Sequence, residues 1–190
     1  MISAIFLAAG KSSRFLGENK LLKIYKKKEL FLHSLENLQK SIVKKIIFVC
    51  GKDANIIKKK IKNKKKIIFI YNADYKCGIS TSIVSGIKKL PKKTKFFFIV
   101  LADMPHIKFN FYKTMFSKAI KLKNKIIFLP MYKKKIGNPV LFSYLFKKKL
   151  LSMNGDVGAK KIIKRNFSKV KFVQFRSGYI LKDYDINSDF

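Results

Sequence analysis

The stretch AIFLAAGKSSR, residues 4–14, is the part of this sequence from which the fold can first be predicted. It begins with an apolar run without polar alternation, which is typical of a strand covered on both faces of a sheet. Small residues ending at Gly10 follow, and then hydroxyl side chains and Arg14. Because ligands of parallel sheets bind beyond the carboxyl ends of the strands, this loop predicts an anion site at the edge of such a sheet.

Similar apolar runs recur along the chain, separated by segments long enough for helices. Residues 30–42 and 111–123 carry apolar side chains at steps of three and four, which is helical spacing. This order predicts an α/β fold with a mostly parallel sheet between two helical layers, a three-layer αβα arrangement of Rossmann-like type. No linker or repeat divides the chain, so we expect a single domain over residues 1–190. The other predicted strands cover residues 45–50, 66–71, 96–102, 125–130 and 170–175.

The composition is strongly basic, with a formal net charge of +34 and a pI near 10.2. Such a charge is typical of proteins that bind nucleic acid or other polyanions. Arginine, however, occurs only at Arg14, Arg165 and Arg176, and lysine is spread along the whole chain. A selected nucleic-acid face would cluster its charge and favour arginine, so this pattern argues against a nucleic-acid partner. A basic nucleic-acid-binding protein is kept as the alternative outside the enzymes.

The cysteines and apolar segments indicate the compartment. Cys50 and Cys77 form neither a C-x-x-C pair nor a framework, so we expect both to be reduced, small, buried side chains. The longest apolar run, residues 96–102, is far shorter than the roughly 20 residues of a membrane helix. The first ten residues lack the positive start of a signal peptide. We expect a cytoplasmic protein without a membrane partner.

The loop after the first strand fits neither of the common phosphate-binding motifs. A P-loop needs a glycine where Ile5 stands, and the dinucleotide fingerprint needs one at Ser12. What remains is a small-residue turn whose N–H groups can approach an anion, followed by Arg14 and Lys20, which can reach phosphate oxygens. The alternative interpretation is a solvated basic loop.

Acidic residues are scarce, and three of them occupy informative positions. Asp103 ends an otherwise uncharged run, where a carboxylate is costly unless it faces a cleft or a cation. Asp183 and Asp185 are expected to share one face of a strand near the C-terminus. Carboxylates beside a phosphate-binding loop predict a Mg²⁺ site completed by substrate phosphates. The alternative assigns Asp103 to a helix cap and Asp183 to a turn.

Two further segments carry polar clusters. Residues 72–87, NADYKCGISTSIVSGI, end a predicted strand and place Ser80, Thr81 and Ser82 at a helix start, where they can bond a base or ribose. The segments GNPVLF and NGDVGAKKI, residues 137–142 and 154–162, contain glycines to which composition assigns no role. His33 and His106 are interpreted as surface or hydrogen-bonded residues and not as catalytic groups.

Taken in order, LAAGKSSRFLGENKLL, NADYKCGISTSI, LADMP, GNPVLF, NGDVGAKKI and DYDINSDF resemble the motifs of the MobA-like nucleotidyltransferase superfamily, whose fold is also called GT-A type. The chain most closely resembles the molybdenum-cofactor cytidylyltransferases in that superfamily. The first motif is widely shared, so it bears on mechanism more than on substrate. GISTS, GNPVLF and GDVGA are more specific to the cofactor branch.

The resemblance implies a role for each matching residue. Arg14 and Lys20 would be the catalytic cations on the triphosphate, and Asp103 with Asp185 or Asp183 would hold Mg²⁺. The nucleotide would contact Ala8, Ala9, Gly10, Ser12, Gly78, Ser80 and Ser82. The second substrate would contact Gly137, Asn138 and Asp156.

The resemblance also implies the reaction. Ala9 matches the pyrimidine-using branch, which favours CTP; CMP would pass to the phosphate of molybdopterin or its metal-bearing form, with release of pyrophosphate. A molybdoenzyme or its maturation chaperone is the implied macromolecular partner. Three departures from the usual pattern are one extra residue between Arg14 and Lys20, Lys160 in place of arginine, and Asn187 in place of proline. Alternatives are a sugar or polyol phosphate as acceptor, the sister guanylyltransferase activity, and a cofactor carrier without catalysis.

Overall fold

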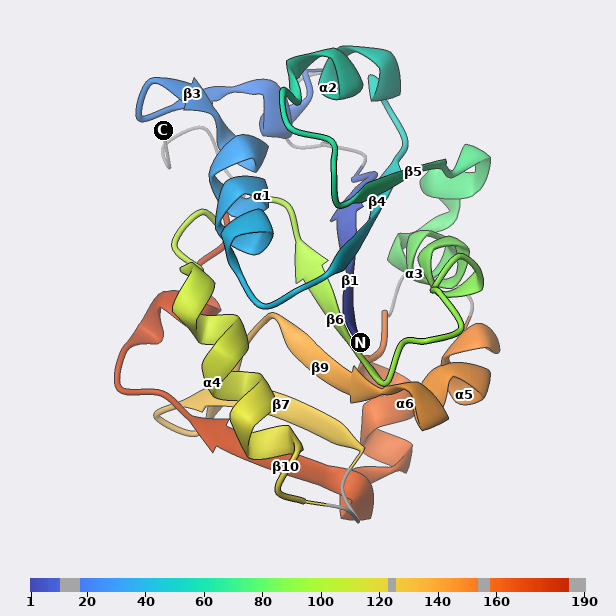
Figure 1. Cartoon of the computed structure of the whole chain (residues 1–190), viewed down its shortest axis with the longest axis vertical. Helices are drawn as coiled ribbons and strands as arrows, with labels where there is room; N and C mark the ends of the chain where they lie inside the picture. Colours follow the sequence, from blue (N-terminus) through green and yellow to red (C-terminus); the bar gives the residue numbers. More distant parts are fainter. Residues whose placement is uncertain (11–17, 123–125, 154–157, 185–190) are drawn as a thin grey trace.

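The computed structural model describes residues 1–10, 18–122, 126–153 and 158–184. Its centre is a twisted sheet in the order β10-β7-β9-β6-β1-β4-β5 (Figure 1). The central strand β1 (Ile2–Ala8) pairs in parallel with β4 (Lys45–Cys50) and with β6 (Phe96–Leu101). Strand β5 (Ile67–Tyr71) pairs in parallel with β4 and forms one edge. The predicted mostly parallel sheet is confirmed.

The other half of the sheet mixes directions. Strand β9 (Val140–Ser143) lies antiparallel between β6 and β7 (Ile127–Tyr132). Strand β10 (Val170–Gln174) runs parallel to β7 at the far edge, and β8 (Lys135–Ile136) forms a hairpin with β7. All six predicted apolar runs are strands. Strand β9 was not predicted, because three apolar residues and a serine after a proline give little local signal.

Helices cover both faces, as predicted. Helices α1 (Leu30–Lys40) and α4 (Phe109–Ala119) lie on one side of the sheet, and α3 (Ile79–Lys88) with α5 (Lys147–Leu151) and α6 (Lys160–Arg165) on the other (Figure 1). Helix α2 (Ala54–Lys60) buries Ile57 in the core on the α1 side. Helix α1 buries Phe31, Leu35 and Leu38, which recur at the helical spacing seen in the sequence.

Strand β1 shows why its sequence is apolar without alternation. Every residue in it is buried. Ala4, Phe6 and Ala8 belong to the core under α1 and α4, whereas Ile5 and Leu7 belong to the core under α3 and α5. Because successive side chains of a strand point to opposite faces, a strand with helices on both sides needs apolar residues at every position.

Short elements connect these layers. Strands β2 (Ile24–Tyr25) and β3 (Lys28–Glu29) form a hairpin whose turn holds Lys26 and Lys27 at positive φ. The 3-10 helices are η1 (Lys20–Leu22), η2 (Ala73–Cys77), η3 (Tyr144–Phe146), η4 (Phe167–Lys169) and η5 (Gly178–Leu181).

Two local predictions are wrong. Residues 182–184 have no regular structure, although the sequence suggested a strand there, because the Tyr184 carbonyl accepts from the Lys20 side chain and not from a strand; Asp185 lies outside the described residues. Cys50 is buried as expected, but Cys77 is exposed, since η2 buries none of its residues.

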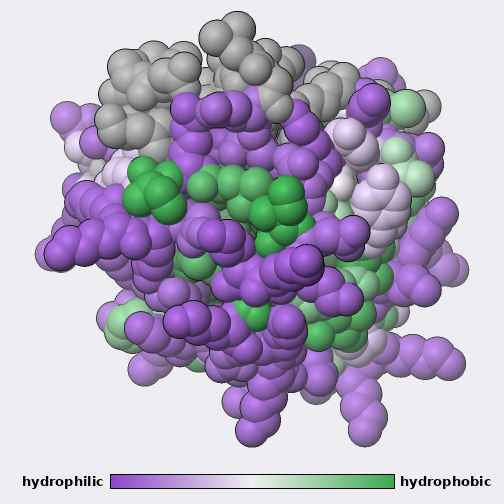
Figure 2. All heavy atoms as spheres, turned by 90° about the horizontal axis from the view of Figure 1, so that it is seen from above, coloured by the Kyte–Doolittle hydropathy of each residue, from purple (hydrophilic) through white to green (hydrophobic). Residues whose placement is uncertain are grey.

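The surface carries its charge diffusely. Figure 2 shows hydrophilic side chains over most of the visible face, interrupted by smaller hydrophobic patches. Exposed apolar side chains include Ile56, Tyr71 and Leu145. Within the ranges that the structure describes, no helix combines the length and the apolar character that crossing a bilayer requires.

Candidate active site

The carboxyl ends of β1 and β6 meet at one edge of the sheet. Leu7 pairs with Leu101 in parallel register, and the N–H of Ala102 donates to the carbonyl of Leu7 over 3.2 Å. Asp103 follows immediately. Its backbone is therefore held beside the end of β1, where the loop with Ala9 and Gly10 begins.

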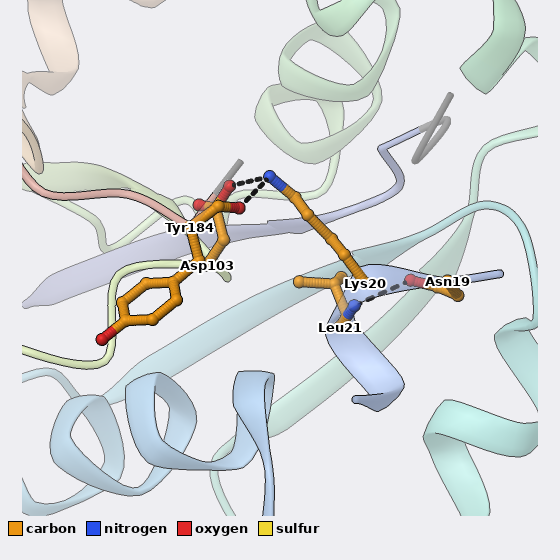
Figure 3. A network of polar contacts seen from close by, with 5 residues as sticks. All are labelled: Asn19, Lys20, Leu21, Asp103 and Tyr184. Carbon is orange, nitrogen blue, oxygen red and sulfur yellow. Dashed lines mark hydrogen bonds and ion pairs between the residues drawn. The ribbon is translucent and has the colours of Figure 1, made fainter. Parts of the chain in front are cut away.

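Lys20 reaches this edge from η1. Its Nζ lies 2.6 Å from Oδ2 of Asp103 and donates to the carbonyl oxygen of Tyr184 over 2.7 Å (Figure 3). The side chains of Lys20 and Asp103 are only 15% and 14% exposed, so the ion pair is largely shielded from water. Electrostatic attraction is stronger in such a setting than at the open surface. Two predicted site residues are thus brought together.

The backbone around Lys20 is fixed by its neighbour. Oδ1 of Asn19 accepts from the N–H of Leu21 over 3.1 Å and caps η1. The Asn19 amide also donates to the carbonyl of Lys52 over 3.4 Å, which connects η1 to the turn after β4. Asn19 therefore sets the point from which the Lys20 side chain extends.

The second oxygen of Asp103 suits a metal ion. Oδ1 is buried and accepts no hydrogen bond from the described residues. A buried carboxylate oxygen without a donor is costly, and Mg²⁺ or Mn²⁺ prefers such oxygen ligands. Oδ1 thus fits a divalent cation while Oδ2 is paired with Lys20.

The remaining predicted ligands are less fully described. Asp183 is exposed and directly precedes Tyr184, whose carbonyl meets Lys20. Asp185, Arg14, Ser12 and Asp156 lie outside the described residues. Counting only the portions that the structure covers, no three His, Cys, Asp or Glu side chains form a group that could hold a metal.

The described residues predicted to contact the nucleotide lie in two places, at the end of β1 and at the start of α3. Ala8 and Ala9 are buried at the end of β1, and Gly10 is exposed with open space where a Cβ would stand. Gly78 precedes α3 with φ of 110°, a conformation that a glycine adopts without strain. Ser80, in the first turn of α3, is buried, and its hydroxyl has no hydrogen-bond partner within the described part of the chain.

Asn72 organises the start of α3 and was not assigned a role from the sequence. It is buried, and its Nδ2 donates to the hydroxyls of Thr81 and Ser82 over 2.9 Å each. Its Oδ1 accepts from the N–H of Asp74 over 3.2 Å. The hydroxyl of Ser82 is therefore engaged inside the protein. The sequence signal that could have indicated this role is an asparagine at the end of a strand, just before a cluster of hydroxyl residues.

A cavity of about 800 Å³ opens at the carboxyl ends of β4 and β5. Lys52 and Lys58 contribute cations to its lining, and Phe69, Tyr71 and Tyr75 contribute aromatic rings. A Cβ at Gly51 would stand 2.6 Å from Cγ of Tyr75, so only glycine leaves room for that ring. The cavity lining does not include Gly78, Ser80 or Ser82.

The two described residues predicted to meet the second substrate lie before β9. The N–H of Asn138 donates to the carbonyl of Ile180 over 2.9 Å, and a Cβ at Gly137 would stand 2.3 Å from that same oxygen. The segment that contacts them, residues 178–184, brings Tyr184 beside Lys20. This segment therefore connects the loop before β9 with the Lys20–Asp103 pair.

His106 belongs to an aromatic group beside the ion pair. Its Nε2 and the hydroxyl of Tyr184 are hydrogen-bonded at 3.0 Å, and the rings of Tyr25 and Tyr184 are 4.9 Å apart. Burial, with help from nearby lysines, lowers the pKa of His106 below its ordinary value. Nε2 of His33 contacts the carbonyl of Tyr25 at 2.6 Å. Both histidines are hydrogen-bonded.

A mostly parallel α/β sheet, with a shielded lysine–carboxylate pair beyond its central strands, defines a nucleotide-handling enzyme fold. The chain belongs to the MobA-like NTP transferase domain family, whose model matches residues 4–170, and it is a nucleotidyltransferase.

Two relatives, one of them in two structures, illustrate the similarity. The molybdenum cofactor cytidylyltransferase of Escherichia coli (strain K12) is 28% identical over 142 residues, which are 75% of this chain and 70% of that protein. The structure of Rv0371c from Mycobacterium tuberculosis H37Rv superposes with a TM-score of 0.85 at 20% identity, covering 99% of this chain and 94% of that one. The manganese complex of Rv0371c superposes with a TM-score of 0.81 at 18% identity, covering 99% of this chain and 95% of that one.

An enzyme named for a different product has the same fold. The 4-diphosphocytidyl-2C-methyl-D-erythritol synthase of Anaerococcus prevotii DSM 20548 superposes with a TM-score of 0.79 at 18% identity, covering 100% of this chain and 92% of that one. The fold alone therefore does not identify the product.

Proposed function

We propose that this nucleotidyltransferase, acting as one domain over residues 1–190, transfers CMP from CTP to the terminal phosphate of molybdopterin or its metal-bearing form. The observation that carries the proposal is the Lys20–Asp103 pair, with Oδ1 of Asp103 buried and unpartnered among the described residues. Support for the substrates comes from the Escherichia coli relative, a molybdenum cofactor cytidylyltransferase.

In the proposed reaction an oxygen of the acceptor phosphate attacks the α-phosphorus of CTP in line. A new P–O bond forms, the bond from the α-phosphorus to the bridging oxygen breaks, and pyrophosphate leaves with that electron pair. The attacking oxygen is already ionised, so no general base is needed. Lys20, together with Arg14, stabilises the charge that develops on the bridging oxygen and on pyrophosphate.

Asp103 is the described residue that would hold Mg²⁺, through Oδ1, and Asp185 is preferred to Asp183 as its companion. The ion would neutralise charge on the nucleotide phosphates. The turn of Ala8, Ala9 and Gly10 would contribute close backbone approach to the nucleotide. Cytoplasmic location and a molybdoenzyme or its maturation chaperone as recipient of the product complete the proposal.

Thermal unfolding with CTP, GTP, UTP or ATP, each with Mg²⁺, tests the nucleotide. The proposal expects CTP to raise the unfolding temperature most, because a ligand that binds only the folded state stabilises it. A preference for GTP would contradict CTP and support the sister guanylyltransferase activity. Pyrophosphate release from CTP then tests the acceptor: molybdopterin should support turnover, and turnover only with a sugar or polyol phosphate would contradict the proposed acceptor.

A further inference from the structure

Tyr184 is held through its carbonyl and its hydroxyl by residues from different parts of the chain. Its carbonyl accepts from Nζ of Lys20 over 2.7 Å, and its hydroxyl is hydrogen-bonded to Nε2 of His106 at 3.0 Å. Its ring packs edge-on against Tyr25, with centroids 4.9 Å apart. The residue is 9% exposed. Side chain and backbone are thus fixed together.

Figure 3 shows in which directions the ring and the carbonyl of Tyr184 point. The ring of Tyr184 points away from Lys20, while its carbonyl faces the ammonium group. The bond to His106 and the packing on Tyr25 can therefore orient the carbonyl without touching Lys20. His106 itself lies three residues after Asp103, in the turn that follows β6.

We propose that Tyr184 is a positioning residue for the transfer reaction: anchored by His106 and Tyr25, its carbonyl holds the Lys20 ammonium on Oδ2 of Asp103. A lysine side chain has many accessible rotamers, so a single acceptor would not hold its ammonium in one position. Two acceptors in a fixed arrangement confine it. The ammonium then stays on one carboxylate oxygen and does not spread over Oδ1, which the proposed function gives to the metal.

The inference rests on the proposed role of Lys20, and three variants separate it from simple core packing. Tyr184→Phe keeps the ring against Tyr25 and removes the hydroxyl, with its bonds to His106 and Tyr25. His106→Leu removes the first of these bonds from the other side, and His106→Gln restores a donor. Tyr179→Phe is the matched control, since Tyr179 lies in η5 on the same segment and packs against Phe175.

The experiment measures pyrophosphate release from CTP with Mg²⁺ and molybdopterin. We expect Tyr184→Phe and His106→Leu to lower kcat about three- to tenfold, the effect of loosening one charge-stabilising donor. The KM for CTP should stay within twofold. His106→Gln should recover at least half of the lost rate, and Tyr179→Phe should leave kcat unchanged.

A double-mutant cycle shows whether Tyr184 acts through Lys20. In a Lys20→Ala background, Tyr184→Phe should have almost no further effect on kcat. An equal loss in both backgrounds would overturn the inference, as would an unchanged kcat in Tyr184→Phe while Lys20→Ala is strongly impaired. If Lys20→Ala itself retains full turnover, the proposed function fails instead.

A crystal structure of Tyr184→Phe tests the inference without any acceptor. We expect Nζ of Lys20 to lose its 2.7 Å contact with the carbonyl of residue 184, or to occupy more than one position. Retention of that contact in a single well-ordered position would overturn the positioning role, whatever the substrate proves to be.

Discussion

Lys20 and Asp103 lie 83 positions apart in the sequence, yet Nζ of one is 2.6 Å from Oδ2 of the other. The pair is possible because β1 and β6 run parallel and end at the same edge, where η1 passes over them. Breaking a largely buried pair leaves one charge without its partner, which is strongly destabilising. The pair therefore combines a structural and a proposed catalytic role.

Replacing Asp103 by asparagine should abolish most of the metal dependence of the reaction. The amide keeps the size of the side chain but loses the charge, and an amide oxygen alone is a weaker Mg²⁺ ligand than a carboxylate. Initial rates across a Mg²⁺ titration check this, with Glu36→Gln as a control because Glu36, on α1, pairs with Lys28 of β3. An unchanged titration curve in Asp103→Asn would refute the assignment.

Gly137→Ala should destabilise the fold. The added Cβ would stand 2.3 Å from the carbonyl oxygen of Ile180, which belongs to backbone and cannot swing aside. Overpacking of this kind costs about 1–3 kcal/mol. Urea unfolding measures it, and Gly10→Ala is the matched control because nothing lies within 4 Å of its added Cβ. Equal stability of the two variants would contradict the close approach of the 178–184 segment.

The two cysteines should react at very different rates. Burial raises the pKa of the Cys50 thiol to about 12, so almost no thiolate is present at neutral pH, whereas Cys77 is exposed. Alkylation with iodoacetamide at pH 7.5, followed by mass spectrometry, should label Cys77 first and Cys50 only after unfolding. Rapid labelling of Cys50 in the native Cys77→Ser variant would show that β4 is less protected than the fold requires.

Much of the fold could be predicted because burial on two faces leaves a strong local mark. The runs that became β1, β4 and β6 are apolar at nearly every position, as expected of strands covered on both faces. Strand β9 was not predicted because it is defined by its pairing with β6 and β7, which are contacts between segments separated in the sequence. Cys77 was misjudged because the burial of a short 3-10 helix depends on its neighbours.

The candidate site was predictable where a side chain stood out chemically. Asp103 is the lone charge at the end of an apolar strand. Lys20 follows the first loop, from where its side chain can reach phosphate oxygens. Tyr184 could not be found in this way, because it contributes a backbone carbonyl, which every residue has. Its bond to His106 depends on how the C-terminal segment returns across the molecule.

The most direct test of the central claim is the turnover of Lys20→Ala with CTP, Mg²⁺ and molybdopterin. A donor that stabilises developing charge is worth roughly 10²–10³ in rate, so kcat should fall by that factor while nucleotide binding changes less. Lys60→Ala is the matched control. Lys60 lies on α2, away from Asp103, and its Nζ is 2.7 Å from Oε1 of the buried Glu29. The account predicts full turnover for Lys60→Ala, and turnover of Lys20→Ala within about threefold of the parent would contradict it.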